Sequence, residues 1–122
     1  MPARILFVDD EQPMLQLLSE YFRQKGCEVK TATNGRQAML LAEMETFDLA
    51  VLDINIAGEN GLQLLSFLKK YFPNLPVIML TGLTPVEELI DQARVRGASG
   101  FMRKTDPLDD LYASLRVYMP EG

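Results

Sequence analysis

The chain lacks histidine altogether and contains a single cysteine. Without an imidazole it cannot use histidine as a general acid or base, as a metal ligand or as a phosphohistidine carrier. If its chemistry involves phosphohistidine, that histidine belongs to a partner. The lone cysteine, Cys27, excludes an internal disulfide and fits a reducing cytoplasm. We expect it to be a small apolar filler after a helix.

The sequence also lacks the features that membrane insertion and nucleic-acid binding need. No apolar stretch approaches the roughly 18 residues that a membrane span needs, and Met1-Pro2-Ala3-Arg4 does not resemble a signal peptide. The net charge of −5 and the lack of a Lys/Arg-rich run argue against nucleic-acid binding. With 48% hydrophobic and 24% charged residues, residues 1–122 are expected to form one soluble domain with a proper core.

Four apolar runs each lead into a polar residue that can handle a phosphoryl group. The residues at the ends of these runs are Asp9-Asp10, Asp53, Thr81 and, after the short Phe101-Met102 run, Lys104. Apolar runs that alternate with helix patterns predict buried strands of a parallel sheet. Ligands of such sheets bind outside the carboxyl ends of the strands, so we expect these polar groups to converge on one pocket.

Five helix patterns alternate with the strands, and a weak alternation over residues 28–33 adds another strand. The helices are expected to begin near Pro13, Asn34-Gly35, Gly61, Thr84-Pro85 and Asp106-Pro107. The apolar positions expected to face the core of the first helix are Met14, Leu17, Leu18, Tyr21 and Phe22, and the third and fifth patterns extend to Phe72 and Met119. Five such βα units predict an α/β, flavodoxin-like, three-layer, doubly wound fold. Its five-stranded parallel sheet would have the order 2-1-3-4-5, with five helices on its two faces.

Three carboxylates in one pocket repel one another. At an effective dielectric constant of about 20, each pair about 4 Å apart costs about 4 kcal/mol. A hard divalent cation such as Mg²⁺ would offset this repulsion, and the Lys104 ammonium is a second source of positive charge. An acidic helix N-terminus favoured by the helix dipole is the simpler explanation of Asp9-Asp10-Glu11 taken alone.

Four motifs, each at its own strand end, make the chain resemble the receiver domain of two-component response regulators (the CheY-like superfamily) over essentially its whole length. The motifs are Val8-Asp9-Asp10-Glu11; Asp53 followed by Gly58 and Gly61; Leu80-Thr81-Gly82; and Gly97-Ala98 followed by Phe101-Met102 and Lys104. Any one of them is weak alone, because acidic pairs and Thr-Gly are common.

The resemblance implies a role for each residue of the pocket. Asp53 would accept the phosphoryl group as an aspartyl phosphate. Asp10, Asp53 and the backbone carbonyl of Asn55 would hold Mg²⁺ or Mn²⁺, and Asp9 would act through a metal-bound water. Lys104 would pair with a phosphoryl oxygen.

The resemblance also implies a switch. Thr81 and Phe101 would move together once the phosphoryl charge arrives, and the loop from Gly82 to Pro85 would be the bistable element. Output would be read on the face made by the fourth helix, the fifth strand and the fifth helix. Asn55 and Leu83, each two residues beyond Asp53 or Thr81, are expected to tune dephosphorylation.

The partners implied are a sensor histidine kinase or a histidine phosphotransfer protein, with an unknown output domain or effector, in the cytoplasm. The protein would catalyse only its own phosphorylation and dephosphorylation. Dimerisation on activation is left open. A stand-alone regulator and a receiver within a longer protein, whose linker begins near Pro120 (residues 120–122), also both remain open.

The chain departs from many receivers at two positions, where Ala57 and Thr105 stand in place of prolines. A cis bond before a non-proline residue costs about 2.5–4 kcal/mol, so either Lys104-Thr105 holds such a bond or its loop runs differently.

Three alternative functions also remain. The first is a Mg²⁺-dependent phosphohydrolase, which is disfavoured because Asn55 stands where a second carboxylate would be needed. The second is a flavin-binding module, which is disfavoured by the acidic first loop, and the third is a degenerate receiver that only mediates contacts.

Overall fold

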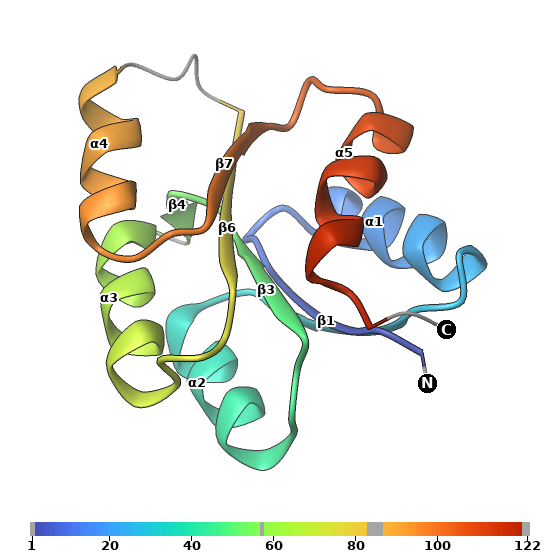
Figure 1. Ribbon diagram of the computed structural model, residues 1–122, viewed down its shortest axis with the longest axis horizontal. Helices are drawn as coiled ribbons and strands as arrows, with labels where there is room; N and C mark the ends of the chain where they lie inside the picture. The colour runs from blue at the N-terminus through green and yellow to red at the C-terminus, as the bar shows by residue number, and fades with distance from the viewer. Residues whose placement is uncertain (1, 57, 83–86, 121–122) are drawn as a thin grey trace.

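Five strands form one parallel sheet in the computed structural model, which describes residues 2–56, 58–82 and 87–120 (Figure 1). The strands lie in the order β2-β1-β3-β6-β7, and every neighbouring pair is parallel. This arrangement confirms the predicted order 2-1-3-4-5. The strands are β1 (Arg4–Val8), β2 (Glu28–Ala32), β3 (Leu49–Leu52), β6 (Val77–Thr81) and β7 (Gly100–Arg103).

Helices cover both faces of the sheet, with α2, α3 and α4 on one side and α1 and α5 on the other (Figure 1). The three-layer flavodoxin-like fold is therefore confirmed. The helices are α1 (Gln12–Gln24), α2 (Gly35–Met44), α3 (Gly61–Tyr71), α4 (Glu87–Val95) and α5 (Leu108–Leu115). A 3₁₀ turn, Arg116–Tyr118, replaces the last part of the fifth helix that we predicted to reach Met119. Among the described residues no helix has the length and apolar character of a membrane span.

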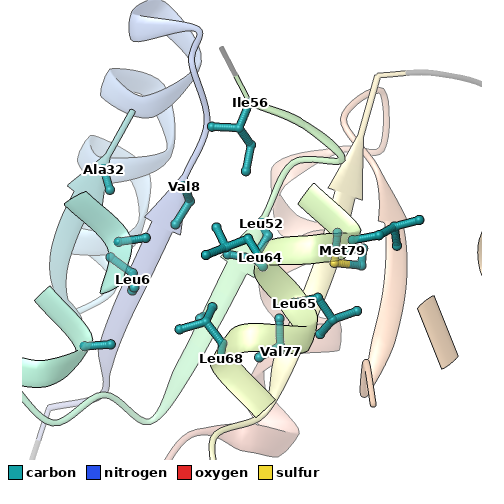
Figure 2. Packing of buried hydrophobic residues seen from close by; sticks show 14 of the residues in the cluster. Leu6, Val8, Ala32, Leu52, Ile56, Leu64, Leu65, Leu68, Val77 and Met79 are labelled. Atoms are coloured by element: carbon teal, nitrogen blue, oxygen red, sulfur yellow. The ribbon is translucent and has the colours of Figure 1, made fainter. Parts of the chain in front are cut away.

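The two faces of the sheet form two separate hydrophobic cores, because successive strand residues point to opposite sides. In β1, Leu6 and Val8 pack on the α2–α3–α4 side, whereas Ile5 and Phe7 pack on the α1–α5 side. Figure 2 shows the first core, where side chains of α3 point toward β3 and β6. Burial on both faces explains why β1, β3 and β6 contain continuous apolar runs.

Local signals for helix starts are largely confirmed. The Asn34 side chain caps α2 by accepting from the Gln37 N–H at 2.9 Å, and Gln37 Oε1 accepts from the Thr33 N–H at 2.9 Å. The second bond comes from the residue before the cap, so it differs by one residue from a capping box, in which the third helical residue accepts from the cap itself. Pro13 lies in the first turn of α1, and Gly26 follows its end with φ of 90°. Cys27 is buried as expected, and burial raises the pKa of its thiol.

Other local predictions are wrong. Leu15, not Leu17, is buried in α1, and Leu17 is 49% exposed. Phe72 lies just beyond the end of α3 instead of within it. Helix α5, by contrast, begins at Leu108, directly after the predicted Asp106-Pro107 start, and the Asp106 side chain accepts from the Arg103 N–H.

The structure also answers the question of the loop after β7. Among the described residues no peptide bond is cis, so the Lys104-Thr105 bond is trans and the loop runs differently from a Lys-Pro loop with a cis bond. The predicted helix start at Thr84-Pro85 and the Ala57 position lie outside the described residues.

Candidate functional site

The ends of four strands place the predicted polar residues at one edge of the sheet. Asp9 directly follows β1, Asp53 follows β3, Thr81 ends β6 and Lys104 follows β7. Backbone hydrogen bonds continue past the strand ends: the Asp53 N–H donates to the Val8 carbonyl at 3.0 Å, and the Lys104 N–H donates to the Thr81 carbonyl at 2.8 Å. The side chains therefore leave the sheet from a fixed backbone frame.

A cleft of about 490 Å³ opens at this edge. It is lined by Asp10, Glu11, Asp53, Asn55, Gly58, Thr81, Gly82 and Lys104. Asp53 and Thr81 are buried at its base and Asp9 is buried beside Asp53, whereas Asp10 and Asn55 are exposed at its mouth. A cavity of similar volume, about 480 Å³, lies at the opposite end of the sheet between residues 42–47 and 72–75 and holds none of the predicted site residues.

The Lys104 ammonium lies among three carboxylates. Its Nζ is 2.6 Å from Asp9 Oδ2, 2.7 Å from Glu11 Oε1 and 3.0 Å from Asp53 Oδ2. The predicted placement of this lysine at the acidic pocket is therefore what the structure shows. Its positive charge offsets part of the repulsion among the carboxylates.

Burial and ion pairing act against each other on the charged groups. For Lys104, burial lowers the pKa, but hydrogen bonds with Asp9, Glu11 and Asp53 outweigh it, so the pKa is raised above its usual range and the ammonium stays charged. For Asp9, burial raises the pKa more than the hydrogen bonds from Lys104 and from the Glu11 N–H lower it. The Lys104 ammonium therefore stays protonated, whereas burial makes the charged form of the Asp9 carboxyl less favourable than it is in water.

The donor set at the cleft suits a hard cation. One carboxylate oxygen from each of Asp9, Asp10, Glu11 and Asp53 lies within 4.8 Å of the others. Mg²⁺ and Ca²⁺ both prefer such oxygen ligands, and Mg²⁺ commonly uses one or two carboxylates with water and phosphate oxygens. The residues present therefore fit a divalent cation beside Asp53.

The segment after Asp53 forms a small hairpin that the sequence did not predict. Strand β4 (Asn55–Ile56) pairs antiparallel with β5 (Glu59–Asn60), and Gly58 makes the turn with φ of 80°. Gly61 then begins α3 so close to this segment that a Cβ there would lie 2.0 Å from the Asp53 carbonyl oxygen. Gly58 therefore permits the turn, and Gly61 permits the start of α3 to pack against the Asp53 backbone.

Phe101, one of the predicted switch residues, does not line the cleft. Phe101 is half-buried in β7 and lines a separate cavity of about 120 Å³ beside α4. Leu83 lies outside the described residues. Sequence reasoning also missed one contact, since Glu11 was assigned no role of its own. Its place directly after Asp9-Asp10 was the available signal.

Comparisons with known proteins agree on one family. The family model described as "Response regulator receiver domain" matches residues 5–116. Sporulation initiation phosphotransferase F of Bacillus subtilis is 31% identical over 120 residues, which is 98% of this chain and 96% of that protein. The chain spans only 22% to 51% of the length of several other curated relatives.

Solved structures show the same fold. A CheY-like response regulator receiver domain protein from Methanospirillum hungatei superposes with a TM-score of 0.90 at 28% identity, covering 96% of this chain and 93% of that one. A response regulator protein from Burkholderia pseudomallei, described with a phosphorylated aspartic acid, a calcium ion and citrate, has a TM-score of 0.86 at 26% identity over 93% of this chain and 66% of that one.

Proposed function

Because this chain belongs to the response regulator receiver domain family, we propose that it is a phosphorylation switch of two-component signalling whose acceptor is Asp53. The observation that carries the proposal is the position of the Asp53 carboxylate. It lies at the base of the cleft, 7% exposed, with the Lys104 ammonium 3.0 Å away and oxygen ligands for a cation beside it. A phosphorylated aspartic acid in the related Burkholderia structure supports the same chemistry.

In the proposed reaction, an Asp53 carboxylate oxygen attacks the phosphorus of a phosphohistidine or an acyl phosphate. A new P–O bond forms while the bond to the donor breaks, and the departing imidazole nitrogen or carboxylate oxygen keeps the electron pair. Lys104 neutralises charge on the phosphoryl oxygens. Mg²⁺ or Mn²⁺, held by Asp10, Asp53 and the Asn55 carbonyl with Asp9 acting through water, would supply further charge neutralisation and orientation.

The phosphoryl group would then bias a switch. It carries a charge of about −1.5 to −2, and its oxygens would accept a hydrogen bond from the Thr81 hydroxyl at the end of β6. Phe101 would respond from the neighbouring strand, and the face of α4, β7 and α5 would present the result to an effector. Asn55 and Leu83 would control the access of water to the aspartyl phosphate.

The wider setting is part of the same proposal. The donor would be a sensor histidine kinase or a histidine phosphotransfer protein in the cytoplasm, since this chain has no histidine of its own. Catalysis would be limited to the phosphorylation and dephosphorylation of Asp53. Residues 1–122 would act as one receiver domain, and any linker to an output domain would begin near Pro120.

The test is phosphoryl labelling of the intact chain by radiolabelled acetyl phosphate. We expect labelling with Mg²⁺, none with excess chelator, and none in Asp53→Asn, which removes the nucleophilic oxygen. Asp91→Asn, which changes an exposed aspartate of α4 in the same way, should label like the wild type. Labelling of Asp53→Asn equal to that of the wild type, or no labelling of the wild type with Mg²⁺ and any phospho-donor, would refute the proposal.

A further inference from the structure

The three hydrogen-bond donors of Lys104 are all engaged. A lysine ammonium has three N–H donors and no acceptor. Three carboxylate oxygens lie within hydrogen-bonding distance of it, from Asp9 at 2.6 Å, Glu11 at 2.7 Å and Asp53 at 3.0 Å. A phosphoryl oxygen can therefore bind this ammonium fully only when one of the carboxylates gives up its place.

The three carboxylates differ sharply in what they lose by leaving. The side chains of Asp9 and Asp53 are 4% and 7% exposed, so neither can turn out into water when it loses the lysine, and losing an ion-pair partner while buried is costly. Asp53 would also carry the phosphoryl group itself. The Glu11 side chain is 63% exposed and can return to water. Glu11 is therefore the carboxylate that can exchange.

The Glu11 side chain is also not needed for the local fold. Glu11 is the residue before the first turn of α1, yet its side chain makes no capping hydrogen bond there. Its backbone does the structural work: the N–H donates to Asp9 Oδ1 at 3.0 Å, and the carbonyl accepts from the Leu15 N–H at 3.1 Å. Changing the side chain leaves both backbone bonds in place.

From these contacts we infer that Glu11 is a positioning residue for Lys104, an exchangeable partner that holds the ammonium until a phosphoryl oxygen displaces it. The inference rests on the proposed function of the cleft. An ion pair with one exposed partner is worth about 0–1 kcal/mol, so removing Glu11 should favour the phosphoryl-bound state by up to about fivefold. In this way Glu11 sets how readily the switch is engaged.

The experiment measures the dissociation constant of beryllofluoride, a tetrahedral phosphoryl mimic, at saturating Mg²⁺ by NMR titration of backbone amides. We expect Glu11→Gln to bind about two- to fivefold more tightly than the wild type, because a neutral amide competes less well for the ammonium. Glu11→Asp keeps the charge but shortens the reach, and it should also bind more tightly. Glu43→Gln, the same charge change on the exposed surface of α2, should bind like the wild type.

Each other outcome has a definite meaning. Unchanged affinity in Glu11→Gln would overturn the inference. Wild-type affinity in Glu11→Asp would overturn it as well, because the effect would then be one of charge alone. If Glu11→Gln weakens binding of Mg²⁺ alone by more than about twofold, Glu11 is a metal ligand and the inference is wrong. A wild-type protein that binds no beryllofluoride would refute the proposed function too.

Discussion

Helices α3 and α4 lie side by side on the same face of the sheet but are held very differently (Figure 1). Helix α3 buries a full apolar face against β3 and β6 (Figure 2). Over residues 87–95, α4 buries only Ala93, and Leu89 and Ile90 are half-buried. A cavity of about 120 Å³ remains between α4 and the strand that carries Phe101.

Gly61, at the start of α3, is also more tightly packed than Gly82, which follows β6 on the α4 side. A Cβ on Gly61, at the start of α3, would lie 2.0 Å from the Asp53 carbonyl oxygen, so backbone packs directly on backbone. Among the described residues, a Cβ on Gly82, after β6, would meet only the Lys104 Cδ at 3.6 Å, an ordinary contact. A perturbation at the cleft therefore meets a rigid helix on the Asp53 side and a loosely held one on the Thr81 side. This asymmetry supports α4 as the moving part of the proposed switch.

The largest effect should come from core truncation. Leu65→Ala in α3 removes a fully buried side chain and should lower the free energy of unfolding by about 2–5 kcal/mol. Leu89→Ala in α4 removes a half-buried one and should cost about 1 kcal/mol. Urea denaturation of both variants measures the two losses. Equal losses would show that α4 is anchored as firmly as α3.

A smaller contrast should appear at the two glycines. Gly61→Ala forces the Asp53 backbone and the start of α3 apart and should cost about 1–3 kcal/mol, the usual range for overpacking. Gly82→Ala meets one ordinary contact among the described residues and should stay within about 0.5 kcal/mol of the wild type. Thermal unfolding of the pair separates them. A Gly82→Ala variant as unstable as Gly61→Ala would mean that the segment before α4 is also tightly packed.

Much of this fold follows from patterns in the sequence. Strands buried on both faces must be apolar throughout, so β1, β3 and β6 were visible as continuous runs. The topology then determines which strand ends meet, and the sequence pattern therefore predicts that Asp9, Asp53, Thr81 and Lys104 lie together. Parallel order and strand-end chemistry are consequences of backbone geometry, and so the sequence could predict them.

Three features could not be predicted from the sequence, because the pattern was ambiguous, the segment was too short or the contact depends on how far a side chain reaches. In α1 the run Met14 to Leu18 contains four apolar residues in five, so its phase is ambiguous and Leu17 was placed inside in error. The two-residue strands β4 and β5 are too short to show any alternation. The Glu11–Lys104 contact joins residues 93 positions apart, and the place of Glu11 after Asp9-Asp10 puts it near the pocket without showing which partner its side chain reaches.

The smallest effect tests what joins the two helices. Arg96, directly after α4, donates from Nη1 to Ser66 Oγ of α3 at 2.9 Å and, more weakly, to the Leu62 carbonyl at 3.4 Å. Arg96→Met keeps much of the apolar stem but removes these bonds, worth about 0.5–1.5 kcal/mol, so amide hydrogen exchange in α4 should speed up by about two- to tenfold. Exchange in α3 should not change, because its burial holds it independently. Arg94→Met, which removes an exposed pairing within α4 itself, is the matched control and should alter exchange much less. If Arg96→Met loosens α3 as much as α4, the two helices open as one unit, and a signal from the cleft could not move α4 alone.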